Sequence, residues 1–294
     1  MKNNARVAIV VLNWNGWRDT LECLASLEKL NYPNYEVVVV DNGSTDGSQT
    51  MIRDAYPGIT VLEMGDNLGF AVANNYAIRY AINEGADFLW LLNNDTVVDT
   101  EALNALITEA VSDRRVGMVG SKIKWYYQPD TIGNAGGAIS TSTARTWLVG
   151  AGEADVGQWD MPRDVDWVSG CSMLASKELV EDVGLLDRRF FLFFEETDWA
   201  IRARQKGWRV RYQPKSTVWH KVSSSVKRDS PNMVFHFARS SVLFAKKHAS
   251  SRFLLSLGMT AVFWVLRPLL RGSLAAASAG VRGLISGLAE MQMR

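Results

Sequence analysis

Asparagine and aspartate side chains follow four apolar runs in the first hundred residues. The runs are residues 7–12, 37–40, 59–62 and 88–92, and the polar residues after them are Asn13 and Asn15, Asp41, Asn67, and Asn93, Asn94 and Asp95. Runs of this length without polar alternation are typical of strands buried on both faces. Asn, Asp and Gly also form ordinary turns, but four such ends in succession favour one shared polar site.

Three acids, Glu195, Glu196 and Asp198, directly follow the aromatic residues of 190–194. A carboxylate can accept a proton as a general base. The same acids could instead only stabilise the first turn of a helix, whose N-terminus attracts negative charge. The apolar run before them favours a site, because it places the acids where the chain leaves a core.

The elements that would position these residues alternate along the chain. Residues with helical spacing lie between the apolar runs, and residues 116–123 form a plausible fifth strand. This alternation predicts an α/β fold with a parallel sheet and right-handed crossovers. Ligands bind beyond the carboxyl ends of the strands in such sheets, which is the edge where the polar residues fall.

The second half of the chain is less regular. Residues 125–168 predict loops and short antiparallel strands, and their aromatic residues could stack on sugars or pack under a lid. Helices are expected near residues 176–183 and 196–206, a short strand at 209–212, and helices from about residue 231.

The usual glycine loops that bind phosphate are missing. The sequence contains neither GxGxxG after the first strand nor GxxxxGK[ST]. If a diphosphate binds, its charge must be met in another way. A divalent cation, Mg²⁺ or Mn²⁺, held by Asp95 is the natural choice, since such ions bridge carboxylates and substrate phosphates.

Five segments together resemble glycosyltransferase family 2, the inverting enzymes with the glycosyltransferase-A fold. They are VVLNWNG at 10–16, VVVVDNGSTDGS at 37–48, NLGFAVANN at 67–75, LLNNDT at 91–96 and FFLFFEETDWAIRARQKGW at 190–208. The residues of these motifs are most similar to those of the bacterial rhamnosyltransferase branch, which uses dTDP-rhamnose to build surface polysaccharides. The resemblance implies a dTDP- or UDP-linked sugar donor and a glycan or lipid-linked glycan acceptor, and no nucleic acid partner.

The resemblance also implies roles for residues. Asn13, Asn15 and Asp41 would hold the nucleoside, and Asn67 and Asn74 would complete that pocket. The family's Asp-x-Asp motif falls on Asn93, Asn94 and Asp95. Because Asn93 replaces an aspartate, Asp95 would carry more of the metal binding.

The general base is implied at Glu196, with Glu195 in support and Asp198 as the chief rival. His220 would join the metal site, since a neutral imidazole binds manganese-like ions. It could instead be a core histidine. The other functional alternatives are a nucleotide-sugar-binding protein without transferase activity, a structural membrane-associated partner, and a nucleotidyltransferase on a related fold.

Charge divides the chain. Residues 1–199 carry 15 Lys/Arg and 29 Asp/Glu, whereas residues 200–294 carry 17 Lys/Arg and only Asp229 and Glu290. The division predicts a catalytic domain over 1–230, with a donor half over 1–123 and an acceptor half over 124–230, and a basic helical tail over 231–294.

The tail is expected to dock on an anionic membrane. The uncharged run at 253–266 is too short to span one, Pro268 follows it, and no other stretch reaches the usual length. The basic candidates are Arg239, Lys246, Lys247, Arg252, Arg267, Arg271 and Arg282. The tail could instead pack on the catalytic domain or pair two copies as a homodimer. With no export signal and only two cysteines, the expected location is cytoplasmic, on the inner face of the cell membrane.

Overall fold

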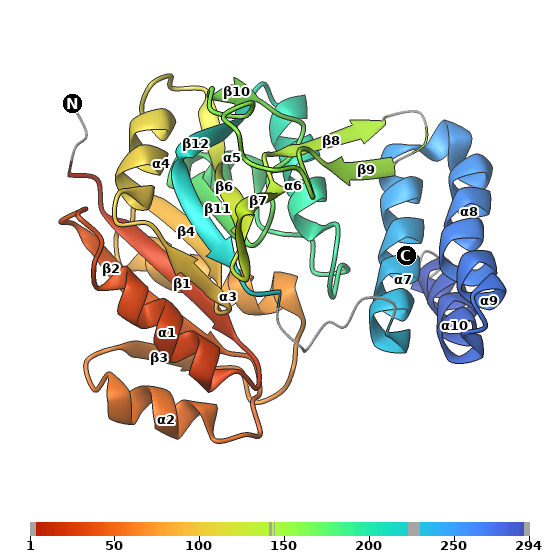
Figure 1. Cartoon of the computed structure of the whole chain (residues 1–294), viewed down its shortest axis with the longest axis horizontal. Coiled ribbons are helices and arrows are strands. Elements are labelled where there is room, and N and C mark those ends of the chain that lie inside the picture. The colour runs from red at the N-terminus through yellow and green to blue at the C-terminus, as the bar shows by residue number, and fades with distance from the viewer. Residues whose placement is uncertain (1–3, 141–142, 144, 223–229, 291–294) are drawn as a thin grey trace.

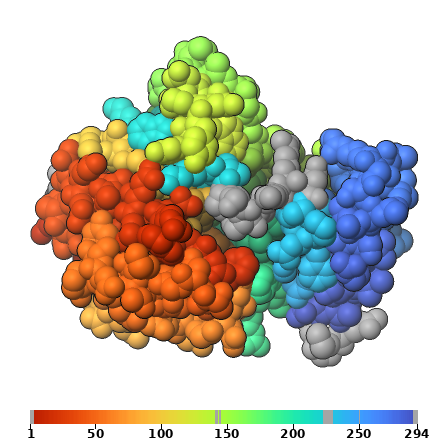
Figure 2. Space-filling view, turned by 60° about the horizontal axis from the view of Figure 1, so that its bottom comes forward, coloured from red at the N-terminus to blue at the C-terminus, as the bar shows by residue number. Residues whose placement is uncertain are grey.

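The structure is a computed structural model that describes residues 4–140, 143, 145–222 and 230–290. A central sheet carries helices on both faces, and helices α7 to α10 stand together at one side (Figure 1). In the space-filling view those helices form a distinct blue mass beside the rest of the molecule (Figure 2).

Ten strands form the main sheet, in the order β10-β12-β6-β11-β4-β1-β2-β3, with β5 added to β12 and β7 added to β6. The strands are β1 (Val7–Asn13), β2 (Tyr35–Asp41), β3 (Thr60–Glu63), β4 (Phe88–Asn93), β5 (Thr96–Val98), β6 (Val116–Trp125), β7 (Gln128–Asn134), β10 (Arg163–Asp164), β11 (Ser172–Ser176) and β12 (Arg209–His220). A hairpin of β8 (Gly137–Ser140) and β9 (Arg145–Leu148) is separate. β1 pairs in parallel with β2 and β4, so the ends of these three strands reach one edge.

Alternate residues of β1 enter opposite cores, which explains its unbroken apolar sequence. Val7, Ile9 and Val11 contact one helical layer, whereas Ala8 and Val10 contact the other. The first layer holds α1 (Trp17–Leu27), α2 (Ser48–Ala55) and α4 (Ala102–Ala110), and the second holds α3 (Phe70–Asn83), α5 (Lys177–Val183) and α6 (Glu195–Gln205). The expected mainly parallel α/β sheet is therefore confirmed.

β12 is longer than the sequence predicted. The strand expected at 209–212 continues to His220, with a register shift between Gln213 and Thr217. Such a bulge accommodates Pro214, which cannot donate a ladder hydrogen bond. The extension brings the end of β12 beside β5, so His220 belongs to the sheet rather than to the loop after it.

The tail is helical, as expected. It contains α7 (Pro231–His248), α8 (Phe253–Ala261), a π-helical turn (Val262–Leu266), α9 (Arg267–Leu270) and α10 (Leu274–Glu290). Ser230 caps α7 by accepting a hydrogen bond from the amide of Met233. α10 packs closely on α7 through glycines: a Cβ on Gly283 would lie 2.4 Å from the carbonyl oxygen of Phe235.

The helical run in the tail is also longer than predicted. It does not stop before Pro268 but reaches Leu270. Proline has no backbone amide to donate, and the wider π-helical turn directly before it accommodates that missing hydrogen bond. The described residues thus include one helix, Phe253–Leu270, whose 18 residues and mean hydropathy of 1.8 would suffice to cross a membrane by length and composition. The expectation that no stretch reaches that length was wrong.

Candidate active site

A cavity of about 790 Å³ lies at the carboxyl edge of the sheet. One wall is the strand edge itself, with Asn42, Asn67, Asn93, Asn94, Asp95 and His220. The facing wall comes from residues 191–193 and from Asn232, Met233 and His236 of α7. The strand edge therefore brings amide, carboxylate and imidazole groups together beside the apolar Leu12, Trp14 and Trp125, and the tail completes the cavity with both apolar and polar side chains.

Asp95 and His220 form the most distinctive polar pair on the cavity wall. Nε2 of His220 lies 3.1 Å from Oδ1 of Asp95. The pair results from strand register, because β12 runs antiparallel to β5 and places His220 opposite Thr96, the residue after Asp95. The amide of Lys221 also donates to the Asp95 carbonyl, at 2.9 Å.

These two side chains fit a divalent cation as a partial site. The 3.1 Å between them is the distance of an ion pair or hydrogen bond, and two adjacent ligands of one divalent ion would lie about as far apart, about 3 Å, once the cation replaced the shared proton. Within the described part of the chain, no group of three or more His, Cys, Asp or Glu side chains is arranged to hold a metal. The protein would therefore supply two ligands, and a donor diphosphate would have to supply others.

Asn93 and Asn94 also line the cavity. Nδ2 of Asn94 turns back toward the loop after β1 and lies 3.0 Å from Oγ1 of Thr20. A Cβ on Gly16 would lie 2.7 Å from this Nδ2, so a larger residue there would displace the Asn94 side chain. Asn94 thus joins the ends of β1 and β4.

Asn13 and Asp41 are fully buried and bond to each other rather than lining the cavity. Nδ2 of Asn13 donates to Oδ2 of Asp41 at 2.7 Å, and the amide of Ser44 and the side chain of Gln49 donate to Oδ1. Both carboxylate oxygens therefore already have partners. In this arrangement the pair braces the loops after β1 and β2.

Of the other asparagines predicted for the nucleoside pocket, one lines the cavity and two do not. Asn67 lines the cavity, and its Oδ1 accepts from Nδ2 of Asn42 at 2.9 Å. Asn15 has a positive φ of 52° and accepts from the amide of Thr45, outside the cavity lining. Asn74 is buried within α3 and donates to the carbonyl of Phe70. The structure therefore does not bring Asn15 and Asn74 to the cavity, and it adds Asn42.

The acidic pair begins α6 directly after a strained turn. Phe193 and Phe194 have φ values of 69° and 72°, a conformation that costs a bulky residue on the order of 1 kcal/mol or more. Backbone outliers of this kind persist where surrounding contacts hold them. The turn sets the direction in which Glu195 and Glu196 leave the chain.

Glu196 is partly buried, and its Oε2 has no hydrogen-bond partner among the described residues. A Cβ on Gly170 would lie 3.9 Å from Cβ of Glu196 and 3.2 Å from the ring of Phe70, a cavity residue. Glu196 therefore lies close behind the cavity wall. Burial raises the pKa of Glu196 to about 7, close to the value that suits a general base at neutral pH.

Glu195 is more deeply buried, and its Oε2 also has no partner among the described residues. Burial first, and then the negative charge of Glu196, raise the pKa of Glu195 well above its ordinary value. Two carboxyls this close in a dry environment resist ionising together.

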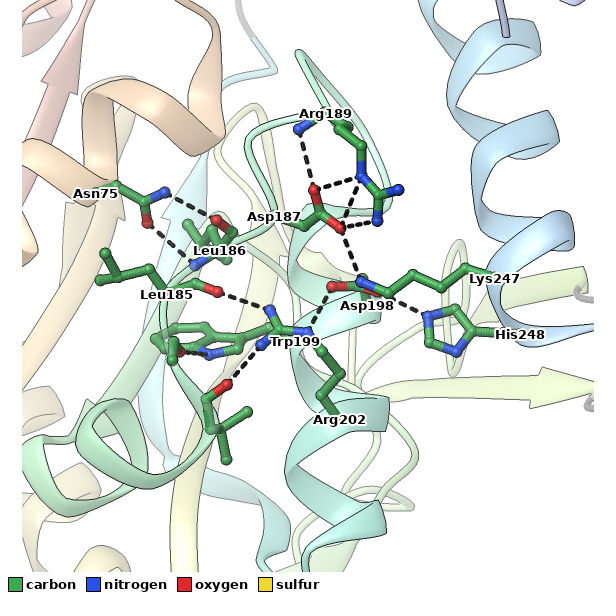
Figure 3. Close-up of polar contacts among 12 residues, drawn as sticks. Asn75, Leu185, Leu186, Asp187, Arg189, Asp198, Trp199, Arg202, Lys247 and His248 are labelled. Atoms are coloured by element: carbon green, nitrogen blue, oxygen red, sulfur yellow. Dashed lines mark hydrogen bonds and ion pairs between the residues drawn. The ribbon is translucent and has the colours of Figure 1, made fainter. Parts of the chain in front are cut away.

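Asp198, the rival base, is fully buried and, like Glu196, is not among the residues that line the cavity. Figure 3 shows its carboxylate among Arg202, Lys247 and His248. Burial alone would raise the pKa of Asp198, but the hydrogen bond to His248 and the charges of Arg202 and Lys247 lower it. Such a carboxylate is a weak base, so the structure disfavours that alternative.

Sequence reasoning missed the contribution of α7 to the cavity. Asn232, Met233 and His236 share one face of that helix, at positions i, i+1 and i+4. The ring of His236 stacks on Phe191 at 4.7 Å, and its buried Nδ1 has no partner among the described residues. The helical spacing of these residues was visible in the sequence, but nothing there indicated which domain the helix would face.

The sequence matches the family model described as glycosyl transferase family 2 over residues 8–166. It is 27% identical over 282 residues to the N-acetylglucosaminyl-diphospho-decaprenol L-rhamnosyltransferase of Mycobacterium tuberculosis, covering 86% of this chain and 85% of that one. It is 26% identical to the dTDP-rhamnosyl transferase RfbF of Shigella flexneri, covering 79% of this chain and 75% of the relative.

Solved structures share the fold at lower identity. A mannosyltransferase of Pyrobaculum calidifontis, in complex with GDP-Man and Mn²⁺, superposes with a TM-score of 0.61 at 20% identity, over 97% of this chain and 75% of that one. GalNAc-T7 with UDP, GalNAc and Mn²⁺ gives a TM-score of 0.65 at 16% identity, over 84% and 51%. The glycosyltransferase-A fold expected from the sequence is thereby confirmed, and the chain belongs to glycosyl transferase family 2, whose members transfer a sugar from a nucleotide donor.

Proposed function

We propose that this glycosyltransferase moves rhamnose, with inversion, from dTDP-rhamnose to an acceptor hydroxyl in bacterial surface polysaccharide synthesis. The rhamnosyltransferases among its relatives, each matched over three quarters or more of both chains, support the donor. The observation that supports transfer most is that the Asp95–His220 pair lines the same cavity that Glu196 approaches.

The residues suit an inverting displacement. The acceptor oxygen attacks the anomeric carbon while the bond from that carbon to the diphosphate breaks, and the acceptor proton passes to Glu196. The products are the glycoside, the nucleoside diphosphate and a protonated Glu196. A divalent cation bound by Asp95 and His220, Mg²⁺ or Mn²⁺, would neutralise charge on the diphosphate. The Mn²⁺ in the two solved relatives supports this proposal.

The donor occupies the sheet side of the cavity in this proposal, and the acceptor the side built by residues 191–193 and α7. A glycan or a lipid-linked glycan suits the second side, because Phe191, Phe193 and Met233 make it apolar. The name of the Mycobacterium relative, an N-acetylglucosaminyl-diphospho-decaprenol L-rhamnosyltransferase, supports the lipid-linked form.

We also propose that the tail, residues 231–294, docks the enzyme on the inner face of the cell membrane. Exposed apolar residues lie on α8, the π-helical turn, α9 and the start of α10: Leu254, Leu255, Val262, Phe263, Leu266, Leu269, Leu270 and Leu274. Another side of α8 is held to the protein, since Oγ of Ser256 donates to the Thr143 carbonyl. A helix attached along one side suits the interface better than a span.

Fewer basic residues of the tail are available to bind anionic lipid than the sequence suggested. Arg239 pairs with Glu290, and Lys247 pairs with Asp187 and Asp198, so these two are not available to lipid. Arg252, Arg267 and Arg282 remain exposed on the tail. Each basic residue near an anionic leaflet contributes about 1 kcal/mol.

The test of the donor is a screen of nucleotide sugars with Mg²⁺ or Mn²⁺, measuring release of nucleoside diphosphate. We expect turnover with dTDP-rhamnose to exceed that with UDP- and GDP-linked hexoses. Faster turnover of another donor would overturn the rhamnose assignment. Binding of a donor with no release under any condition would favour a binding protein without transferase activity.

A further inference from the structure

Helix α7 contacts the segment that precedes and begins α6 at many points along its length. The rings of His236 and Phe237 stack on Phe191 and Phe193, with centroids 4.7 Å and 3.7 Å apart. Oγ of Ser240 donates to the Leu192 carbonyl at 2.8 Å. These contacts cover the strained turn at Phe193 and Phe194, so α7 holds a backbone conformation that the turn would not favour alone.

The far end of α7 is joined to α6 by charge. Oδ1 of Asp198 lies 2.7 Å from Nε2 of His248 and 2.6 Å from Nζ of Lys247 (Figure 3). Nζ of Lys247 also lies 2.8 Å from Oδ2 of Asp187, which pairs with Arg189. The Asp198 carboxylate that Lys247 and His248 contact has no exposed surface.

Neutralising Asp198 does not by itself require α7. Arg202, one turn later on α6, already lies 2.8 Å from Oδ2 of Asp198 and donates to the carbonyls of Val183 and Leu185. That arrangement alone would satisfy one side of the carboxylate and anchor α6 to the catalytic domain. The contacts from Lys247 and His248 therefore add a connection between helices.

We propose that Asp198 is a positioning residue, which through Lys247 and His248 fixes the start of α6 and so holds Glu196 in its place close behind the cavity wall. The proposal rests on the assignment of Glu196 as the base. Asp198 lies two residues after Glu196 in the same helical turn, and its amide donates to the Phe194 carbonyl at 2.8 Å. Any shift of Asp198 relative to α7 is thus passed to the turn and to Glu196.

The experiment compares four full-length variants with the wild type, using whichever nucleotide sugar is turned over and water or a glycan as acceptor. Asp198→Asn and Lys247→Met each remove one charge from the connection. Lys246→Met is the matched control, because Lys246 is exposed and its ammonium lies 5.6 Å from the Phe253 ring, away from Asp198.

We expect kcat to fall about 10- to 100-fold in Asp198→Asn and Lys247→Met, the scale of a small misplacement of a catalytic group. The donor KM and the nucleoside diphosphate Kd should change less than about twofold, because the donor side of the cavity is not touched. Lys247→Arg should recover most of the rate, and Lys246→Met should match the wild type.

A wild-type kcat in Lys247→Met would overturn the proposal. So would a loss of kcat that comes with an equal loss of nucleoside diphosphate affinity, since that pattern means general damage to the fold. If Asp198→Asn does not fold, Lys247→Met decides. Failure of the base assignment is separate: it would appear as full turnover in Glu196→Gln with the same donor, whatever the other variants do.

Discussion

Nε2 of His220 lies 3.1 Å from Oδ1 of Asp95, and the pairing of β12 with β5 sets this distance. The two residues are 125 positions apart in the sequence; His220 ends β12, and Asp95 lies in the turn between β4 and β5. A pair held in this way is already arranged for a cation, which lowers the cost of binding one.

Asp95→Ala should therefore remove most transfer and most metal dependence, because it deletes the only carboxylate proposed as a ligand. His220→Ala should raise the Mg²⁺ or Mn²⁺ concentration needed for half-maximal rate by about 10-fold or more, on the scale of a lost metal-site contact. Calorimetry of dTDP without metal supplies the control, since nucleoside affinity should stay near the wild-type value. An unchanged metal dependence in His220→Ala, or full activity in excess chelator, would contradict the site.

Glu196→Gln should lower transfer by about 10²- to 10⁴-fold with donor binding intact, since the amide cannot accept the proton. In the wild type, the rate should rise as pH increases through about 7, where Glu196 loses its proton. That rising limb should be absent from the residual activity of the variant. A wild-type rate profile that is flat between pH 5.5 and about 8.5, around the pKa, would contradict the role.

The same carboxyl makes a prediction about stability that is independent of activity. The pKa of Glu196 is near 7 in the folded protein and is ordinary, about 4.5, in the unfolded chain. The folded state therefore binds more protons between these values, and its stability falls as pH rises through that window. The difference between the Tm of Glu196→Gln and that of the wild type, measured by thermal unfolding, should favour the variant more at pH 8 than at pH 5. An equal difference at both pH values would mean that Glu196 is not buried as described.

The sequence was sufficient for the parts of the fold that rest on local pattern. Continuous apolar runs predicted β1, β2, β4 and β6, since strands buried on both faces leave no room for polar residues. The run at 59–62 also predicted β3, but that strand lies at the edge of the sheet and is only partly buried. It was not sufficient for the end of β12, where a bulge carries the strand past Pro214, or for the continuation of the tail helix to Leu270 past Pro268. In both cases a proline that stops regular structure locally is accommodated by its neighbours.

For the candidate site, too, some residues could be predicted from local sequence and others could not. Asp95, His220 and Glu196 were predicted from motifs, and the structure brings them to one cavity or close behind its wall. Which amides face that cavity depends on side-chain hydrogen bonds that no motif specifies. Asn13 turns to Asp41 and Asn74 turns to Phe70, whereas Asn42 faces the cavity. The share of the cavity built by α7 depends on tertiary packing alone.

Packing of α10 can be tested by a pair of glycine substitutions. A Cβ on Gly280 would lie 1.9 Å from the Trp264 carbonyl oxygen, so Gly280→Ala must push α10 away from the π-helical turn. We expect a loss of about 1–3 kcal/mol in the free energy of unfolding, as for other overpacked positions. Gly258→Ala in α8 meets nothing within 4 Å and is the control. It should stabilise slightly, because alanine has the better helix propensity. Equal unfolding midpoints for the two variants would contradict the close packing of α10.

Membrane docking can be tested on the full chain by substitutions on its outward face. Truncation before α8 would also remove α10, which packs on α7, so point changes are the cleaner choice. Leu254, Leu270 and Leu274 are 80%, 79% and 71% exposed, and replacing all three with serine removes apolar surface without disturbing a core. We expect the wild type to float with vesicles of anionic phospholipid at low salt and the triple variant to remain in the soluble fraction.

Val156→Ser with Met161→Ser is the control, because these residues are 82% and 76% exposed far from the tail in sequence, and it should float like the wild type. If the face instead pairs two copies, sedimentation will show a dimer that the triple variant loses, and neither protein will float. That result, or flotation of the triple variant at the wild-type level, would overturn the docking proposal.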